Sequence, residues 1–182
     1  MPDSRVDETI HVLFFYQFDH RMSSQGRQLI ESLIGRCPIK ANGHHIVLES
    51  LKSVCEQTGI EWTISLLDRL RGVIESGRHP LAFAILVEDA RPASSAGNLF
   101  FEVGYWLGRR EDRSVRVIRH GQVDPPSNLD GTIIQEVKSD IEAAGVLRRH
   151  VEEWLRSRRD ATGGAWPNPP HANRSTSAYR TE

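Results

Sequence analysis

Four polar residues in one stretch of the chain recur at a spacing that suits chemistry. On a helix the positions i, i+4, i+7 and i+11 form one stripe, which here runs along the edge of an apolar face: Asn98, Glu102, Tyr105 and Arg109. A carboxylate at such a margin can be partly buried and still reach a ligand. Because Glu102 would lie in the first turns, the positive end of the helix dipole favours its ionised form.

The spacing alone also fits a simpler interpretation. Glu102 would then be a solvated helix carboxylate and Tyr105 a residue at the rim, because carboxylates held in clefts are a minority. Two glycines of the same stretch, Gly104 and Gly108, lower helix propensity by about 1 kcal/mol each relative to alanine. Together with an exposed part of Trp106, they indicate close packing of the sheet or of another subunit against this helix.

Strands and helices are predicted to alternate around this stretch. Apolar runs predict strands at 10–16, about 45–48, 81–87, 114–118 and 132–134. Apolar residues at helical spacing predict a first helix that contains residues 29–34 and has Ser23 or Ser24 as its N-cap. Further helices are predicted from about 54 to 74, with a break near Gly59, and at 98–109 and 137–159. This alternation predicts an α/β fold with a mostly parallel sheet covered on both faces.

In such a sheet the ligand lies beyond the carboxyl ends of the strands, where the strand order reverses. The candidate site loops are therefore 16–20, 88–97 and 120–131. Side chains at the strand ends could stack on a ring or hydrogen-bond a ribose, although ordinary strand-end packing explains them as well: Tyr16, Phe18, Asp19, Glu88 and Asp89. The adjacent histidines His44 and His45 lack Cys or acidic partners at ligand spacing, so we expect no metal site.

The composition limits the partners and the compartment. The 182 residues suit one domain, and a net charge of −1 provides no field for nucleic acid or an anionic membrane. No apolar run approaches the ~20 residues of a spanning helix, and the start of the chain lacks a signal-peptide pattern. With only two cysteines, a reduced cytoplasmic protein is expected. We expect a flexible segment at 1–9, a folded domain at 10–159 and a disordered Gly/Pro/Ser-rich tail at 160–182.

The polar stripe belongs to a longer pattern, Asn98-Leu-Phe-Phe-Glu-Val-Gly-Tyr-Trp-Leu-Gly-Arg109. This pattern resembles the Asn-Val-x-Phe-Glu-Leu-Gly-x-x-x-Gly-Arg signature of bacterial TIR-like predicted nucleotide-binding proteins. That family is a branch of the group that joins TIR domains and nucleoside 2-deoxyribosyltransferases. Two later segments resemble further elements of the family, in the same order: Pro126-Ser-Asn-Leu-Asp-Gly131 and Glu142-Ala-Ala-Gly145.

The resemblance implies a flavodoxin-like, TIR-type fold of three layers with a four- or five-stranded sheet. It maps the catalytic glutamate of NAD+ cleavage onto Glu102, and we expect the substrate also to contact Asn98, Tyr105 and Ser127. NAD+ would be the substrate, with no further cofactor. Because TIR-type sites are commonly completed by a neighbouring subunit, the resemblance also implies a homo-oligomer, and the setting it suggests is bacterial antiphage defence.

One carboxylate suffices for this reaction. Breaking the bond between ribose C1′ and nicotinamide creates an oxocarbenium-like sugar, which a fixed anion stabilises. The pyridinium leaves as a neutral base, so no general acid is needed. At the corresponding place, deoxyribosyltransferases have a pattern similar to Asp-x-Gly-Thr-x-x-Glu-x-Gly. In this chain Ala96 and Asn98 occupy the positions of its Asp and its first Gly. This difference favours NAD+ over a nucleoside.

Two other functions remain open on the sequence. Within enzymes, the alternative is a nucleoside or nucleotide N-glycosidase or a 2-deoxyribosyltransferase, which would release a purine or pyrimidine. Outside enzymes, the alternative is a silent module that binds a nucleotide signal and assembles. The base released from each substrate distinguishes the two enzymes, and no release at any concentration favours the module.

Overall fold

The computed structural model describes residues 8–16, 22–60, 65–88, 96–110, 114–123 and 134–161, without the side chains of 96–98. Within these residues six strands form one sheet: β1 (Thr9–Tyr16), β2 (Ile39–Ala41), β3 (His44–Ser50), β4 (Leu81–Val87), β5 (Val115–His120) and β6 (Ile134–Glu136). Five helices accompany them: α1 (Ser24–Gly35), α2 (Leu51–Thr58), α3 (Leu66–Glu75), α4 (Ala96–Arg109) and α5 (Asp140–Ala161). The chain is therefore an α/β protein, as the alternating pattern predicts.

The strand order in the sheet is β2-β3-β1-β4-β5-β6. All neighbouring pairs are parallel except β2 with β3, which pair antiparallel at one edge. From β1 the chain first moves outward to β3 and then returns to the other side of β1 to build β4, β5 and β6. The winding thus reverses between β1 and β4, and the carboxyl ends of these two strands define the edge where α/β sheets bind ligands.

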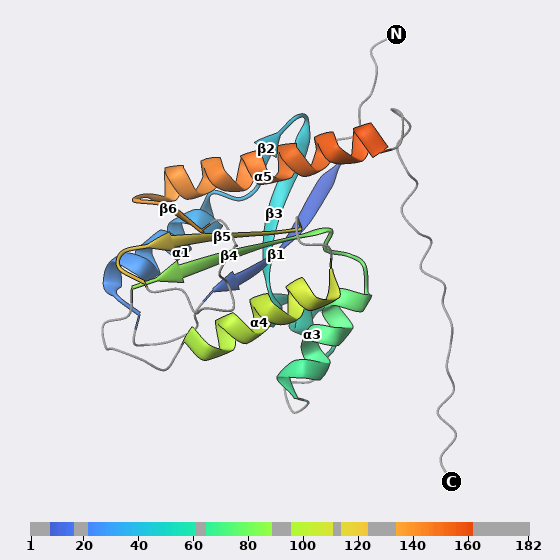
Figure 1. The fold of residues 1–182 in the computed structure, drawn as a ribbon, viewed down its shortest axis with the longest axis horizontal. Helices are drawn as coiled ribbons and strands as arrows, with labels where there is room; N and C mark the ends of the chain where they lie inside the picture. The colour runs from blue at the N-terminus through green and yellow to red at the C-terminus, as the bar shows by residue number, and fades with distance from the viewer. Residues whose placement is uncertain are drawn as a thin grey trace.

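Helices cover both faces of the sheet, so that the molecule has three layers (Figure 1). On one face, α1 and α5 cover a core that includes Phe14 and Phe83; on the other, α2, α3 and α4 cover a core that includes Phe15 and Trp106. All seven residues of β4 are buried, which explains why this strand is a continuous apolar run rather than an alternating one. The prediction of a central strand at 81–87 is confirmed.

The sheet is wider than the predicted four or five strands, because residues 39–41, for which the sequence predicts no strand, form the edge strand β2. Asn42 and Gly43 connect β2 to β3, and both have positive φ angles, of 48° and 83°. An Asn-Gly pair with this backbone forms the tight turn that suits an antiparallel hairpin. The Asn-Gly pair in the sequence is thus the signal that predicts this extra strand.

Three details of the helices bear on the predictions. The break near Gly59 is confirmed: α2 ends there in a left-handed residue with φ 71°, and α3 starts after Ser65. The expectation of a partly exposed Trp106 is wrong, since its ring is fully buried and its Nε1 donates to Ser114 Oγ at 2.9 Å. At Gly108, apart from its chain neighbours and the backbone of α4 itself, no atom of the described residues lies within 4 Å of the position that a Cβ would occupy, so the sheet does not pack against it.

The two ends of the folded part lie close to the predicted limits. Strand β1 starts at Thr9, and α5 continues to Ala161, two residues into the segment predicted as a tail. Residues 1–7 and 162–182 are outside the described part of the chain. Within the described part, no helix combines the length and the apolar character needed to cross a bilayer.

His150 of α5 is a buried histidine, and we expect its burial to make the stability of the fold sensitive to acid. Its side chain is 2% exposed, and burial, assisted by the charge of Arg116, lowers its pKa to about 4. In the unfolded chain the pKa is near 6.5, so between pH 6.5 and 4 the unfolded state binds more protons. The contribution of His150 to the free energy of unfolding should therefore fall by about 3 kcal/mol as the pH drops through this window.

Replacing His150→Leu should flatten this dependence. The free energy of unfolding is measured in urea at pH 7 and pH 4.5, and on going to pH 4.5 the wild type should lose about 3 kcal/mol relative to the variant. His45→Leu, at a partly exposed histidine on β3, is the matched control and should retain the wild-type difference. Equal pH dependence in His150→Leu and wild type would contradict the assignment.

Candidate active site

Helix α4 is anchored to the sheet by a row of buried apolar side chains. Leu99, Val103 and Trp106 are at most 2% exposed and belong to the core on this face. The ring of Trp106 meets the ring of Phe15 on β1 edge-on, with centroids 6.1 Å apart. This row fixes the rotation of the helix, and therefore which direction Glu102 takes.

Glu102 lies one position before Val103, so it points to the side of the helix rather than into the sheet. It is partly buried, as the stripe pattern predicts. It is six positions after Ala96, and at ~1.5 Å of rise per residue this places Glu102 about 9 Å from the start of α4. Since α4 follows β4, that start is near the carboxyl edge of the sheet. The carboxylate thus lies in the half of the helix closer to that edge.

The electrostatics of Glu102 differ from the prediction. Burial raises its pKa to about 7, and the positive charge of Arg69 on α3 opposes this rise. The sequence pointed only to the helix dipole, which favours the ionised form, whereas the shift of the pKa follows from the loss of hydration on burial. Near pH 7 the group is about half protonated, which is the range in which catalytic carboxylates operate.

Arg69 is a residue of this site that sequence reasoning missed. Its Nε and Nη1 atoms are buried, and its charge acts both on Glu102 of α4 and on Cys55 of α2. In the sequence, Arg69 stands between Leu67 and Leu70 in an amphipathic helix, which is an ordinary place for a solvated arginine. The packing of α3 against both α2 and α4 belongs to the tertiary fold, which this local pattern does not show.

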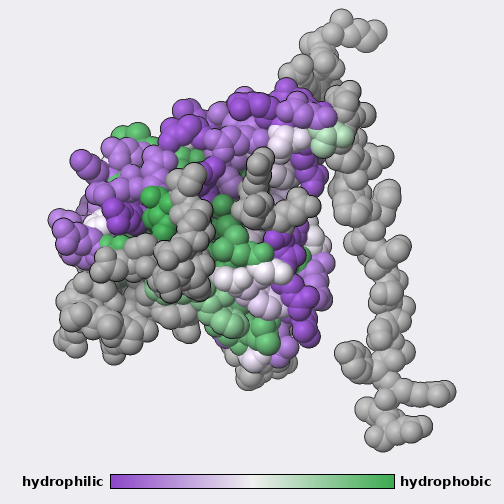
Figure 2. Space-filling view, in the orientation of Figure 1, coloured by the Kyte–Doolittle hydropathy of each residue, from purple (hydrophilic) through white to green (hydrophobic). Residues whose placement is uncertain are grey.

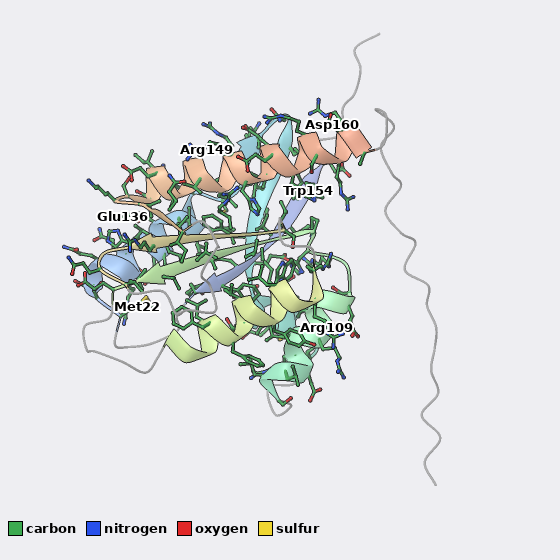
Figure 3. All side chains as sticks on the ribbon, in the orientation of Figure 1. Met22, Arg109, Glu136, Arg149, Trp154 and Asp160 are labelled. Atoms are coloured by element: carbon green, nitrogen blue, oxygen red, sulfur yellow. The ribbon has the colours of Figure 1, made fainter. Side chains whose placement is uncertain are left out.

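The remaining stripe residues are spread along α4. Tyr105 stacks on the ring of Phe101, with centroids 6.2 Å apart, and the Arg109 guanidinium lies 5.5 Å from the centre of the Tyr105 ring. Phe101 is 46% exposed. Apolar residues gather on the surface over α4, whereas the surface over α5 is hydrophilic (Figure 2). Arg109 lies at the end of α4 away from Met22, which marks the start of α1 (Figure 3). For Asn98 only the helical backbone is described.

Tyr16 ends β1 at the same edge of the sheet but faces the other layer. Its ring packs on Phe14, with centroids 4.8 Å apart, in the core covered by α1 and α5. Burial raises the pKa of Tyr16, and a hydrogen bond with the Ser50 side chain opposes the rise. The structure thus does not bring Tyr16 and Glu102 to one face. A ligand that contacts both must cross the edge of the sheet.

The backbone is closely packed at the edge of the sheet formed by the carboxyl ends of β1 and β4. A side chain at Gly26 of α1 would place its Cβ 2.8 Å from Cβ of Val87, so only glycine lets this helix start so close to β4. The backbone N–H of Ser23 donates to the carbonyl of Glu88 at 3.4 Å, and the Glu88 N–H donates to the carbonyl of His120 at 3.0 Å. Glu88 itself is exposed at this edge, where the strand-end prediction places it.

Other sequence candidates fall outside the described residues: Phe18, Asp19, Asp89 and Ser127. Among the residues that are described, no three His, Cys, Asp or Glu side chains are grouped so that they could hold a metal ion. On α4, the described side chains offer one partly buried carboxylate, Glu102.

Comparisons with known proteins add little to this geometry. No family model matches the chain, and no curated protein matches it. Among solved structures, the chain is similar to the monomethylamine corrinoid protein of Methanosarcina barkeri, with a TM-score of 0.41 and 12% sequence identity. The match covers 78% of this chain and 57% of that chain, so this chain spans somewhat more than half of its length. A likeness of this size carries no information on activity.

Proposed function

We propose that this chain is a flavodoxin-like, TIR-type domain that hydrolyses the bond between nicotinamide and ribose in NAD+. Glu102 is its catalytic carboxylate, and the products are nicotinamide and linear or cyclic ADP-ribose. The setting that the family resemblance suggests is antiphage defence in the bacterial cytoplasm. The proposal is based on the resemblance of residues 98–109 to the signature of the TIR-like family.

The observation that carries the proposal is the position of Glu102. It combines partial burial, a pKa near 7 and a place in the carboxyl-edge half of α4, the helix that follows the central strand. When ionised, such a carboxylate stabilises the positive charge that develops on the ribose. The strand order β3-β1-β4-β5-β6 also agrees with the flavodoxin-like order, in which the ligand lies where the winding reverses.

The same pKa supports a second candidate, a nucleoside N-glycosidase. A carboxyl group that is half protonated near pH 7 can donate a proton to a departing purine or pyrimidine, which leaves poorly as an anion. The two reactions need opposite protonation states of Glu102. Cleavage of NAD+ should increase with pH to a plateau above about 7, whereas acid-assisted release of a base should decrease over the same range.

The test is incubation of the purified chain with NAD+, and separately with deoxynucleosides, from pH 5.5 to 8.5. Released bases are identified by chromatography. Nicotinamide release that increases with pH supports the proposal, and release of free adenine or cytosine that decreases with pH supports the second candidate. No release from any substrate, together with NAD+ binding by calorimetry, indicates the non-catalytic nucleotide-sensing module.

We also propose that the active form is a homo-oligomer. Phe101 and Leu67 are at least 40% exposed on the outer side of α4 and α3, and the surface at Gly108 is open. These features leave room for a neighbouring chain on this side of the molecule. Activity per molecule should increase with protein concentration between ~0.1 and 50 μM, with association in that range measured by light scattering. Activity that is strictly proportional to concentration, with a monomer throughout, would contradict this proposal.

A further inference from the structure

His120 is the last residue of β5 and lies at the carboxyl edge of the sheet, beside the end of β4. It pairs in register with Val87, and its backbone carbonyl accepts a hydrogen bond from the Glu88 N–H at 3.0 Å. Ile118, two positions earlier on the strand, belongs to the core covered by α1 and α5. Because side chains alternate along a strand, the His120 ring faces this same layer.

One hydrogen bond fixes which nitrogen of the His120 ring carries the proton. Nδ1 lies 3.0 Å from the carbonyl oxygen of Val137, shortly before α5. A carbonyl oxygen can only accept, so Nδ1 must donate, and in the neutral ring the lone pair is then on Nε2. No described residue bonds Nε2, and this atom is not buried. His120 therefore offers a hydrogen-bond acceptor at the carboxyl edge.

The carboxylate of Glu88 is held at the same place. A Cβ at Gly121 would lie 2.6 Å from Glu88 Oε2 and 2.7 Å from Glu88 Cβ, so the carboxylate lies against the residue that follows His120. With φ 79°, Gly121 has a backbone conformation that favours glycine. The Glu88 backbone is fixed on both sides, because its N–H donates to His120 and its carbonyl accepts from the Ser23 N–H at 3.4 Å. The Glu88 side chain is exposed, so a ligand can reach it.

We propose that His120 and Glu88 form a sugar subsite that binds the vicinal diol of a ribose. Both groups only accept hydrogen bonds, since an ionised carboxylate has no donor and Nε2 of this tautomer has none either. They suit a ligand group that donates twice, as the two ring hydroxyls of ribose do, and they disfavour a phosphate, which is itself an anionic acceptor. A carboxylate beyond a strand of a parallel sheet is a recurrent acceptor for ribose hydroxyls.

The proposed function decides which ribose of NAD+ this subsite binds. Glu102 belongs to α4, which covers the opposite face of the sheet, and there it would act on the ribose next to nicotinamide. The His120 ring faces the layer of Tyr16, so it binds the ribose of the adenosine half. The choice of adenosine rests on the proposed function, whereas the two acceptors are a property of the folded chain.

The binding test compares ADP, which contains the adenosine and the pyrophosphate of NAD+, with 2′,3′-dideoxy-ADP. Calorimetry on the full chain at about pH 8 should show ADP binding at least about tenfold more tightly, which is the effect of about one such hydrogen bond. Glu88→Ala and His120→Phe should each lose most of this preference. Glu136→Ala, which removes a carboxylate from β6 at the same edge (Figure 3), is the matched control and should keep it. Equal affinity for the two nucleotides in the wild type, or no binding of ADP at millimolar concentration, would overturn the inference.

A second measurement leaves both side chains in place, in case their replacement unfolds the chain. In protein labelled with ¹⁵N-histidine, the His120 ring, assigned by through-bond experiments, should carry its proton on Nδ1 and a free lone pair on Nε2 at about pH 8. Addition of ADP should shift the Nε2 signal, and 2′,3′-dideoxy-ADP should not. A proton on Nε2, or an Nε2 signal that ADP does not shift, would also overturn the inference.

Failure of the subsite and failure of NAD+ cleavage are distinguishable. If the chain prefers ADP as described and releases no nicotinamide from NAD+, the subsite stands and the proposed function is wrong. If the chain cleaves NAD+ but binds the two nucleotides equally, the proposed function stands and the subsite is wrong.

Discussion

Replacing Glu102→Gln should reduce NAD+ cleavage by at least about 100-fold. The amide keeps the shape and the hydrogen-bonding capacity of the side chain but removes the anion that stabilises the ribose cation in the transition state. The loss should appear in kcat rather than in KM, because the charge acts on a cation that the ground state of the sugar lacks. The measurement is nicotinamide release at pH 8, where the wild-type carboxylate is ionised. Activity retained within a few-fold would remove Glu102 from the catalytic role.

The same substitution should stabilise the protein at high pH, which separates lost catalysis from lost folding. The folded-state pKa of Glu102, about 7, is higher than the ~4.5 of an unfolded chain, so the wild type loses stability as the pH rises through 7. A difference of ~2.5 pKa units corresponds to about 3 kcal/mol at pH 8 and to almost nothing at pH 4. Glu102→Gln should therefore be more stable than the wild type at pH 8 and equal to it at pH 4. Strained catalytic groups commonly show this opposition between activity and stability.

The fold could be predicted from the sequence wherever one local pattern decided it. The seven apolar residues of β4, the Ser23 cap of α1 and the break at Gly59 all follow from neighbouring residues, and the structure confirms them. Strand β2 was missed because its three residues are too short to show a period. The Asn42-Gly43 turn that forms the hairpin was the available signal.

The candidate site could be predicted only in part. Helical spacing placed Glu102 correctly at the edge of the apolar face of α4. The same spacing could not show that Tyr105 stacks on Phe101, or that Tyr16 belongs to the opposite layer, because both depend on how the layers pack. The direction of the Glu102 pKa shift was also out of reach. The helix dipole is a local property, whereas burial depends on how distant segments pack.

Glu49 is the clearest case of a residue whose role no local pattern reveals. It ends a strand, where an acidic residue is usually solvated, yet it is 6% exposed. Its Oε2 accepts a hydrogen bond from His79 Nε2 at 2.7 Å, and its Oε1 lies 2.6 Å from Arg78 Nη2 and 3.1 Å from His11 Nδ1. The partners from the turn before β4 are about thirty positions away in the sequence. Three parts of the sheet, β1, β3 and the start of β4, are thus joined through one carboxylate.

The protonation states within this cluster follow from burial. Burial lowers the pKa of the fully buried His79, although the hydrogen bond with Glu49 and the Glu49 charge oppose this shift. At neutral pH the His79 ring is therefore neutral and its Nε2–H donates to Glu49. Burial alone would raise the pKa of Glu49, but the His79 hydrogen bond and the charges of His11 and Arg78 bring it below its ordinary range. At neutral pH the cluster therefore contains an ionised Glu49 paired with Arg78.

Replacing Glu49→Ala should cost about 3–5 kcal/mol of unfolding free energy at pH 7. The substitution leaves the His79 N–H buried without its acceptor and Arg78 without its counter-ion, and broken buried pairs cost this much. Urea denaturation followed by circular dichroism measures the change. The matched control is Glu153→Ala on α5, whose 52%-exposed carboxylate lies 2.7 Å from Arg116 Nη2 and whose loss should cost no more than about 1 kcal/mol. If the two variants lose equal stability, the Glu49 cluster is no more than another surface pair. A large loss at Glu49 alone identifies it as the group that joins β3 to the start of β4.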